Sequence, residues 1–180
     1  MPIETGKNAS ILTYNGITPK IHKTVFLTEG VRIIGDVEIG EDSSVWYNSV
    51  IRGDVHFIRI GKRTNIQDLS MLHVNHGTCP LFVGDNVTVG HSAILHGATI
   101  GNCVLIGMGA RVLDRSIIGN YSLVAAGAVV REGFEVPEGT LAAGVPAKII
   151  RELTPEERTR LETSAANYVR YSSDYKKQIS

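Results

Sequence analysis

The sequence predicts an all-β solenoid followed by a single helix, and two observations support this. An aliphatic residue recurs every six positions through most of the chain and is often followed by glycine. Only 6% of the residues are aromatic, whereas valine, isoleucine, alanine and glycine abound. This composition suits a narrow, regularly packed interior better than a layered core built on large rings.

The repeat can be followed through fourteen aliphatic positions in one register. An amphipathic helix would repeat about every 3.6 residues and a half-buried strand about every 2. Six residues instead describe a short strand and a turn, where glycine tolerates strained backbone conformations. Three such rungs would complete a triangular coil, and successive coils would pair as strands about 4.8 Å apart. The rungs begin at Ile39, Val45, Ile51, Ile60, Ile66, Leu72, Val83, Val89, Leu95, Ile100, Ile106, Val112, Ile118 and Val124.

Three rungs depart from the six-residue length. The rung from Ile51 has three extra residues, the rung from Leu72 has five, and the rung from Leu95 is one residue short. Insertions in a solenoid loop outward, usually on a functional face. Two of the three irregular rungs, those from Leu72 and Leu95, carry histidines of the stretch from Leu72 to Thr99, so the irregularities indicate where a site lies.

A helix is predicted after the repeat. Thr154 is a suitable N-cap, Pro155 suits the first helical position, and Glu157 completes a capping box. One apolar stripe follows and comprises Leu161, Ala165 and Tyr168. We expect this helix to pack along the outside of the β-helix.

Composition and charge narrow the classes of function. Eighteen basic and 18 acidic residues balance, so we expect no nucleic-acid partner and no attraction to an anionic membrane. Cys79 and Cys103 do not make a disulfide framework, and we interpret them as loop and core residues. The first ten residues do not resemble a signal peptide, and no apolar run approaches transmembrane length. We expect one cytoplasmic domain over residues 1–180, with the β-helix over about 10–146 and the helix over about 154–175.

Four of the six histidines lie in a single stretch, Leu72 to Thr99, although the repeat needs no imidazole for packing. Counting rungs places Arg52, His73 and His96 in one outward-facing column, with the two histidines in adjacent coils. Two imidazoles at this spacing can bind one metal with bonds of about 2.0–2.1 Å. The four histidines are His73, His76, His91 and His96.

His91 falls on the preceding face, stacked on Asp68 and beside Gln67. A corner separates it from the pair, so complementary parts of one site lie on two faces. A cyclic trimer would bring His91 of one subunit to His73 and His96 of its neighbour. Three histidines and one open position are typical of catalytic zinc, and imidazole also suits Fe²⁺ and Co²⁺.

Such a metal would lower the pKa of its bound water toward about 7 and generate hydroxide at neutral pH. Gln67 and Asp68 would then orient the water or the substrate. Arg52 and Asp54 would form a charge-assisted pair at the subunit interface.

Several motifs together resemble the γ-class carbonic anhydrases over almost the whole chain. This resemblance implies a left-handed parallel β-helix, an exception to the usual right-handed crossover. It also implies a homotrimer with zinc between subunits, a metal-bound hydroxide as nucleophile, and reversible hydration of CO2 to bicarbonate. In that family two histidines of one subunit and one of its neighbour bind the metal, which matches His73, His96 and His91. The motifs are IRGD (51–54), NIQD (65–68), LHVNHG (72–77), VTVGHSAILHG (87–97), IGMGA (106–110) and AAGVPAK (142–148).

Other roles follow from the same motifs. Arg52 and Asp54 resemble the family's interface pair, and Gln67 and Asp68 resemble its polar residues near bound water. Tyr168 is similar to a helix tyrosine that lines the family's active site.

One departure concerns the proton shuttle. The best-studied branch of the family carries an acidic loop after the first histidine, with a glutamate that moves protons. Here the loop is short and His76 stands where the glutamate would be. Imidazole has an unperturbed pKa of about 6.5, so we predict His76 as the shuttle.

Two alternatives stay open. A hexapeptide acyltransferase would use one histidine as general base against an acyl-CoA. A metal-binding trimeric protein would keep the site with little or no catalysis. We interpret the other histidines, His22 and His56, as solvated surface residues.

Overall fold

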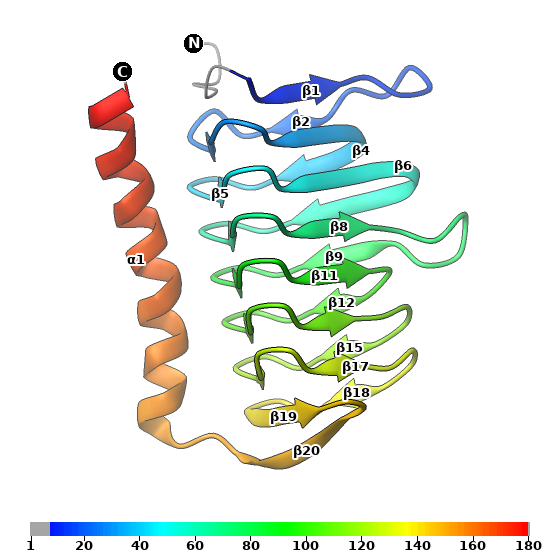
Figure 1. Ribbon diagram of the computed structural model, residues 1–180, viewed down its shortest axis with the longest axis vertical. Helices are drawn as coiled ribbons and strands as arrows, with labels where there is room; N and C mark the ends of the chain where they lie inside the picture. The colour runs from blue at the N-terminus through cyan, green and yellow to red at the C-terminus, as the bar shows by residue number, and fades with distance from the viewer. Residues whose placement is uncertain (1–7, 180) are drawn as a thin grey trace.

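The structure is a computed structural model that describes residues 8–179. It shows a left-handed parallel β-helix with one long helix running beside the stack (Figure 1). The predicted fold class is confirmed. Residues 1–7 and 180 lie outside the described part, and with them most of the ten-residue segment for which no signal peptide is predicted.

Two hydrogen-bonded sheets form the three faces of the prism. One face is an eight-stranded sheet made of β3 (Phe26–Leu27), β5 (Ser44–Val45), β7 (Asn65–Ile66), β10 (Thr88–Val89), β13 (Leu105–Ile106), β16 (Leu123–Val124), β19 (Thr140–Gly144) and β20 (Ala147–Glu152). Every pair in it is parallel except β19–β20, an antiparallel hairpin that ends the stack.

The other two faces belong to one twelve-stranded sheet, because β4 (Arg32–Ile39) and β6 (Val50–Ile60) continue around the corner between them. One of these faces also contains β1 (Ser10–Leu12), β8 (Met71–His73), β11 (Ile94–His96), β14 (Arg111–Val112) and β17 (Val129–Val130). The other also contains β2 (Lys20–Ile21), β9 (Leu81–Val83), β12 (Thr99–Ile100), β15 (Ile117–Ile118) and β18 (Glu135–Val136).

The core consists of the aliphatic residues that define the repeat. All fourteen predicted rung positions are buried, and none exposes more than 5% of its surface. The stack also extends beyond them, through Leu27 and Ile33 at one end and Val130, Val136 and Ala142 at the other. These five keep the six-residue spacing of their neighbours, so the repeat is longer than the fourteen rungs counted in the sequence.

The rung irregularities lie at one corner of the prism. The extra residues after Ile51 lengthen β6 as it turns the corner. The five extra residues after Leu72 form a loop closed by Asn75, whose backbone N–H donates to the Cys79 carbonyl at 3.2 Å. Figure 1 shows this loop, between β8 and β9, projecting from the stack. The loop therefore starts directly after His73, at the end of β8.

Helix α1 (Pro155–Ile179) packs against the eight-stranded sheet. Leu161 and Ala165 of the predicted stripe are buried. Trp46 fills the space between helix and sheet, with its ring 5.4 Å from Tyr168 and 5.2 Å from Tyr175, both edge to face. Within residues 8–179, no helix is both long enough and apolar enough to cross a bilayer.

The predicted capping box begins the helix. The Glu157 backbone N–H donates to Thr154 Oγ1 at 3.2 Å, and Glu157 Oε2 accepts from the Thr154 backbone N–H at 2.9 Å. Arg151 donates to both carboxylate oxygens of Glu157 at 2.7 Å. Hydrogen bonds from Arg151, then from Thr154, lower the pKa of Glu157 to about 2 from its ordinary value of 4.5.

This pKa difference predicts a pH-dependent contribution to stability. The folded state prefers the charged form of Glu157, so its contribution is present above pH 4.5 and is lost as the pH falls toward about 2. We expect Glu157→Gln to lower the thermal midpoint at neutral pH and to flatten its decline over this window, measured by circular dichroism. Glu132→Gln, which removes an exposed partner of Arg115, is the control and should follow the wild-type profile. An unchanged profile for Glu157→Gln would contradict the assignment.

Candidate metal centre

His73 and His96 lie side by side on adjacent coils. They are register partners in the parallel pair β8–β11, as rung counting predicts. His73 Nδ1 and His96 Nε2 are 3.2 Å apart, and the ring centroids are 5.1 Å apart. Two nitrogens that bind one tetrahedral metal with bonds of about 2.0–2.1 Å lie about 3.3 Å apart, so this spacing fits a shared metal ion.

A carboxylate contacts the other nitrogen of each ring. Asp54 Oδ1 lies 2.9 Å from His73 Nε2, and Asp114 Oδ1 lies 2.5 Å from His96 Nδ1. Asp54 also pairs with Arg52. Burial opposes ionisation of Asp54, but hydrogen bonds from His73 and Arg52 outweigh it and lower the pKa of its carboxyl. Asp54 is therefore an ionised acceptor at neutral pH.

These carboxylates determine which ring nitrogens carry hydrogen. An ionised carboxylate only accepts, so His73 donates from Nε2 and His96 donates from Nδ1. A neutral imidazole has one N–H, which leaves lone pairs on His73 Nδ1 and His96 Nε2. These two lone pairs face each other across 3.2 Å and repel unless a proton or a metal cation lies between them. The pair is therefore suited to bind one metal ion through these two nitrogens.

His91 lies in the turn between β10 and β11, at the far end of β11 from His96. Its Nδ1 lies 2.6 Å from Asp68 Oδ2, the stacked neighbour expected from the rung count. His91 therefore repeats the pattern of the pair, with one ring nitrogen held by a carboxylate and Nε2 left over. Within one chain, residues 8–179 contain no group of three or more His, Cys, Asp or Glu side chains arranged as a complete metal site.

The polar residues near His91 are held by the sheet and the helix. Gln67 is buried, and its Nε2 donates to Asn65 Oδ1 at 3.1 Å. Asn65 in turn donates to Thr88 Oγ1 at 3.0 Å, and Thr88 contacts Ser164 of α1 at 3.0 Å. This buried chain fixes the orientation of the Gln67 amide.

Tyr168 lies on α1 against this part of the sheet. Burial, followed by the nearby Asp68 carboxylate, raises the pKa of the Tyr168 hydroxyl. Tyr168 is consequently a neutral hydrogen-bond donor at neutral pH. The structure brings it near Asp68, the partner of His91, rather than near the His73–His96 pair.

His76 lies in the exposed loop that follows β8. In the described part of the chain, its side chain makes no hydrogen bond or ion pair, whereas Asn75 beside it donates to Asp114 Oδ2 at 2.9 Å. The role of His76 as a proton shuttle stays a prediction.

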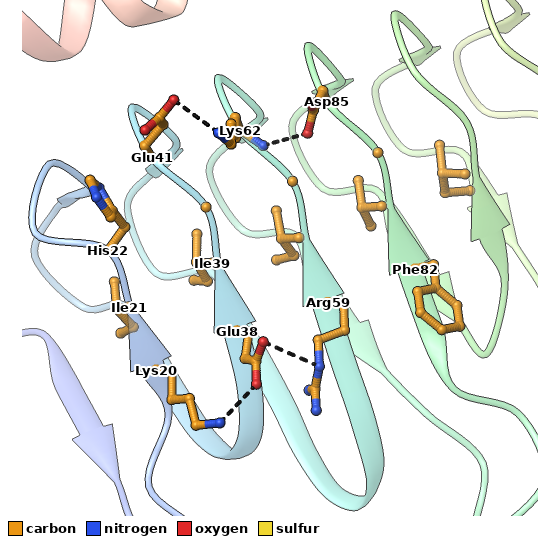
Figure 2. Close-up of a pocket in the computed structure, with 16 residues that line it drawn as sticks. Lys20, Ile21, His22, Glu38, Ile39, Glu41, Arg59, Lys62, Phe82 and Asp85 are labelled. Atoms are coloured by element: carbon orange, nitrogen blue, oxygen red, sulfur yellow. Dashed lines mark hydrogen bonds and ion pairs between the residues drawn. The ribbon is translucent and has the colours of Figure 1, made fainter.

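A groove of about 770 Å³ lies on the face formed by β2, β9 and β12 and the later parts of β4 and β6. Figure 2 shows its charged side chains paired with one another: Lys20 with Glu38 at 3.1 Å, Arg59 with Glu38 at 3.6 Å, and Lys62 with Glu41 at 3.2 Å. The three predicted ligand histidines do not line it. The groove is therefore separate from the candidate metal centre.

Sequence reasoning missed Asp114, Asn75 and Asn65. Asp114 had no usable signal, because the rung from Leu95 is one residue short: Leu95 pairs with Val112, so rung counting places Leu113 rather than Asp114 beside His96. Asn75 had none, since the path of an inserted loop is not given by spacing. Asn65 falls in the NIQD motif, but its contact with Gln67 depends on side-chain direction.

Comparison with known proteins supports the resemblance. A family model described as bacterial transferase hexapeptide (six repeats) matches residues 97–132. A carbonic anhydrase of Geobacillus kaustophilus is 46% identical, with 92% of this chain and 91% of that protein covered. The mitochondrial γ carbonic anhydrase 2 of Arabidopsis thaliana is 43% identical over 84% of this chain, which spans only 56% of the plant protein. The chain belongs to the γ-class carbonic anhydrase family of hexapeptide-repeat proteins.

Solved structures agree with this family fold. A Bacillus cereus protein, named only provisionally as an acetyltransferase, has a TM-score of 0.93 and 45% identity, with 96% of this chain and 99% of that chain covered. A hexapeptide transferase family protein of Anaplasma phagocytophilum has a TM-score of 0.88 and 43% identity, with 92% and 97% covered. Both names refer to transferases, so the names of family members cover two chemistries.

Proposed function

We propose that this γ-class family member is a homotrimeric metalloenzyme that interconverts CO2 and bicarbonate. His73 and His96 of one subunit and His91 of its neighbour would hold the metal, with zinc, iron(II) and cobalt(II) all compatible with imidazole ligands. A metal at this site would acidify water and polarise the substrate. The proposal extends the activity named for the relatives to this chain.

One observation carries the proposal: the facing nitrogens of His73 and His96, 3.2 Å apart, with a carboxylate behind each ring. Metal-binding histidines characteristically donate their second N–H to a carboxylate, which orients the ring and raises its basicity. A histidine acting as a general base needs no second imidazole at this distance. The arrangement therefore favours metal binding over acid–base catalysis by one histidine.

The apolar surface around the histidines supports closure between subunits. Leu69 and Met108, in the corner turns on either side of the His91 turn, expose 63% and 61% of their surface. Met71 and Ile94 are only partly buried on the face that carries the pair. Apolar surface of this kind marks association sites. A trimer would cover it and bring His91 to the pair of a neighbouring subunit.

The remaining residues would act around the metal. Gln67, fixed by Asn65, would orient the substrate or water, and Tyr168 would donate a hydrogen bond from its neutral hydroxyl. Arg52 would hold Asp54 in its ionised form behind His73. His76 would carry protons between this region and solvent.

Some relatives are named as transferases, so an acyltransferase is the second candidate. It requires a CoA site, and the groove in Figure 2 has its cationic side chains paired with carboxylates rather than open to phosphates. A catalytically silent metal protein is the third candidate. CoA binding would indicate the acyltransferase, whereas retention of metal without turnover would indicate the silent metal protein.

The full chain should be purified, loaded separately with zinc, cobalt(II) and iron(II), and assayed for metal content and CO2 hydration. We expect about one metal ion per chain and measurable hydration. His96→Ala should lose both, whereas His22→Ala, at an exposed histidine outside the cluster, should keep both. Full occupancy without hydration for every metal would favour the silent protein, and CoA binding without metal would favour the acyltransferase.

A further inference from the structure

Asp114 reaches His96 from the next coil of the prism. It follows β14 by two residues, at a corner, and only 11% of its side chain is exposed. Oδ1 accepts from His96 Nδ1 at 2.5 Å and Oδ2 accepts from Asn75 Nδ2 at 2.9 Å. Each carboxylate oxygen therefore has its own partner, one on a predicted ligand and one on the loop after β8.

The residue after His96 makes this approach possible. Gly97 has a positive φ of 55°, and a Cβ at this position would lie 2.4 Å from Asp114 Oδ1 and 2.7 Å from Cys79 Cβ. Cys79 is buried, so it has little room to move. A side chain at position 97 would push Asp114 away from His96. Glycine is needed here for space as well as for conformation.

The hydrogen bond to Asp114 determines which tautomer His96 adopts. Free neutral imidazole can carry its hydrogen on either nitrogen. Donation from Nδ1 to Asp114 leaves the Nε2 lone pair directed at His73 Nδ1, 3.2 Å away. Without Asp114, a hydrogen on Nε2 would occupy the position where a metal must bind.

We propose that Asp114 is a positioning residue for the metal centre: it holds His96 in the Nδ1–H tautomer and, through Asn75, ties the loop that carries His76 to this ligand. Neither the family resemblance nor the comparisons assign a role to Asp114. The part of this inference that concerns metal affinity rests on the proposed function, whereas the tautomer does not.

The first test uses the full-length, metal-free protein labelled with ¹⁵N-histidine, at a pH where its imidazoles are neutral. Long-range ¹H–¹⁵N correlation spectra, assigned with His96→Gln, should show the Nδ1–H tautomer for His96 in the wild type. Asp114→Ala should shift His96 toward the Nε2–H tautomer, and Glu132→Gln, at a surface carboxylate of the following coil, should not. An Nε2–H tautomer in the wild type, or no change in Asp114→Ala, would overturn the proposal.

The second test measures cobalt(II) affinity by competition with a chelator, together with the visible spectrum of the bound cobalt. Loss of a carboxylate behind a ligand histidine typically weakens metal binding about 10–100-fold, and we expect this for Asp114→Ala. Asp114→Asn has the same shape and keeps one acceptor oxygen, so it should fall between Asp114→Ala and the wild type. If Asp114→Ala does not fold, Asp114→Asn replaces it in the comparison with the wild type.

The two hypotheses fail in different ways. A wild type that shows the Nδ1–H tautomer but binds no cobalt would overturn the metalloenzyme and leave the positioning of His96 standing. A wild type that binds cobalt no more tightly than Asp114→Asn and Asp114→Ala would overturn the role of Asp114 and leave the metalloenzyme standing.

Discussion

Mixing His91→Ala subunits with His73→Ala subunits is expected to restore metal sites that neither variant holds alone. In the proposed trimer, each site combines His73 and His96 of one subunit with His91 of the next. A homotrimer of either variant lacks one ligand at every site. In a mixed trimer, one of the three interfaces joins an intact pair to an intact His91, so that site has its full ligand set.

The expected recovery of metal sites follows from the random mixing of subunits. Random assembly from equal amounts places both variants in about three quarters of the trimers, so about a quarter of all sites should be intact in a cyclic trimer. Co-expressed variants should therefore bind about a quarter of the wild-type cobalt and show about a quarter of its hydration activity. The single-variant proteins should bind cobalt at least about 10-fold more weakly than the wild type.

A chain with both substitutions is the matched control. The double variant His73→Ala/His91→Ala has the same substitutions in one subunit, so its homotrimer cannot combine intact halves. Recovery in the mixture and none in the double variant would support a site shared between subunits. No recovery from confirmed mixed trimers, or metal retained by His91→Ala alone, would contradict it.

Ile118→Ala is expected to destabilise the protein far more than Ile117→Ala, although the two residues are neighbours on β15. Ile118 points into the prism and exposes 1% of its surface, whereas Ile117 exposes 45%. Truncating a buried isoleucine costs about 2–5 kcal/mol because it removes apolar contacts and leaves a cavity. Truncating an exposed one usually changes stability by less than about 0.5 kcal/mol.

Because both residues are isoleucines on the same strand, comparing the two variants tests the effect of burial alone. Both variants and the wild type should be unfolded in urea at the same protein concentration. Subunit association, which depends on concentration, then stabilises the three proteins to a similar degree. The midpoint should fall clearly for Ile118→Ala and little for Ile117→Ala. Equal falls would mean that the face with β15 is covered in the assembly, and a larger fall for Ile117→Ala would contradict the register.

The fold could be predicted because burial in a β-helix repeats with the rung. Each of the fourteen rung positions lies in the core, and the same six-residue spacing continues through further buried positions at both ends. The capping box was also predictable, since Thr154 and Glu157 contact each other within one helical turn. Both patterns depend on local spacing alone.

The candidate site could be predicted in part. His73 and His96 are neighbours because equivalent residues of adjacent parallel coils pair directly, so their contact follows from counting despite the loop between them. The same holds for His91 and Asp68. Asp114 and Asn75 were not found, because their contacts run across corners and from an inserted loop.

The sequence by itself determined the six-residue period, the core, the start of the helix and the stacking of His73 on His96, since each depends on regular spacing along the chain. Only the tertiary structure decided which nitrogen of each imidazole is held by a carboxylate, how Gly97 admits Asp114, and how Asn65 orients Gln67. The physical reason is that side-chain direction at a corner depends on the backbone conformation of the turn and on what packs there from the next coil. The spacing of residues along the chain predicts neither the conformation of the turn nor the packing of the next coil.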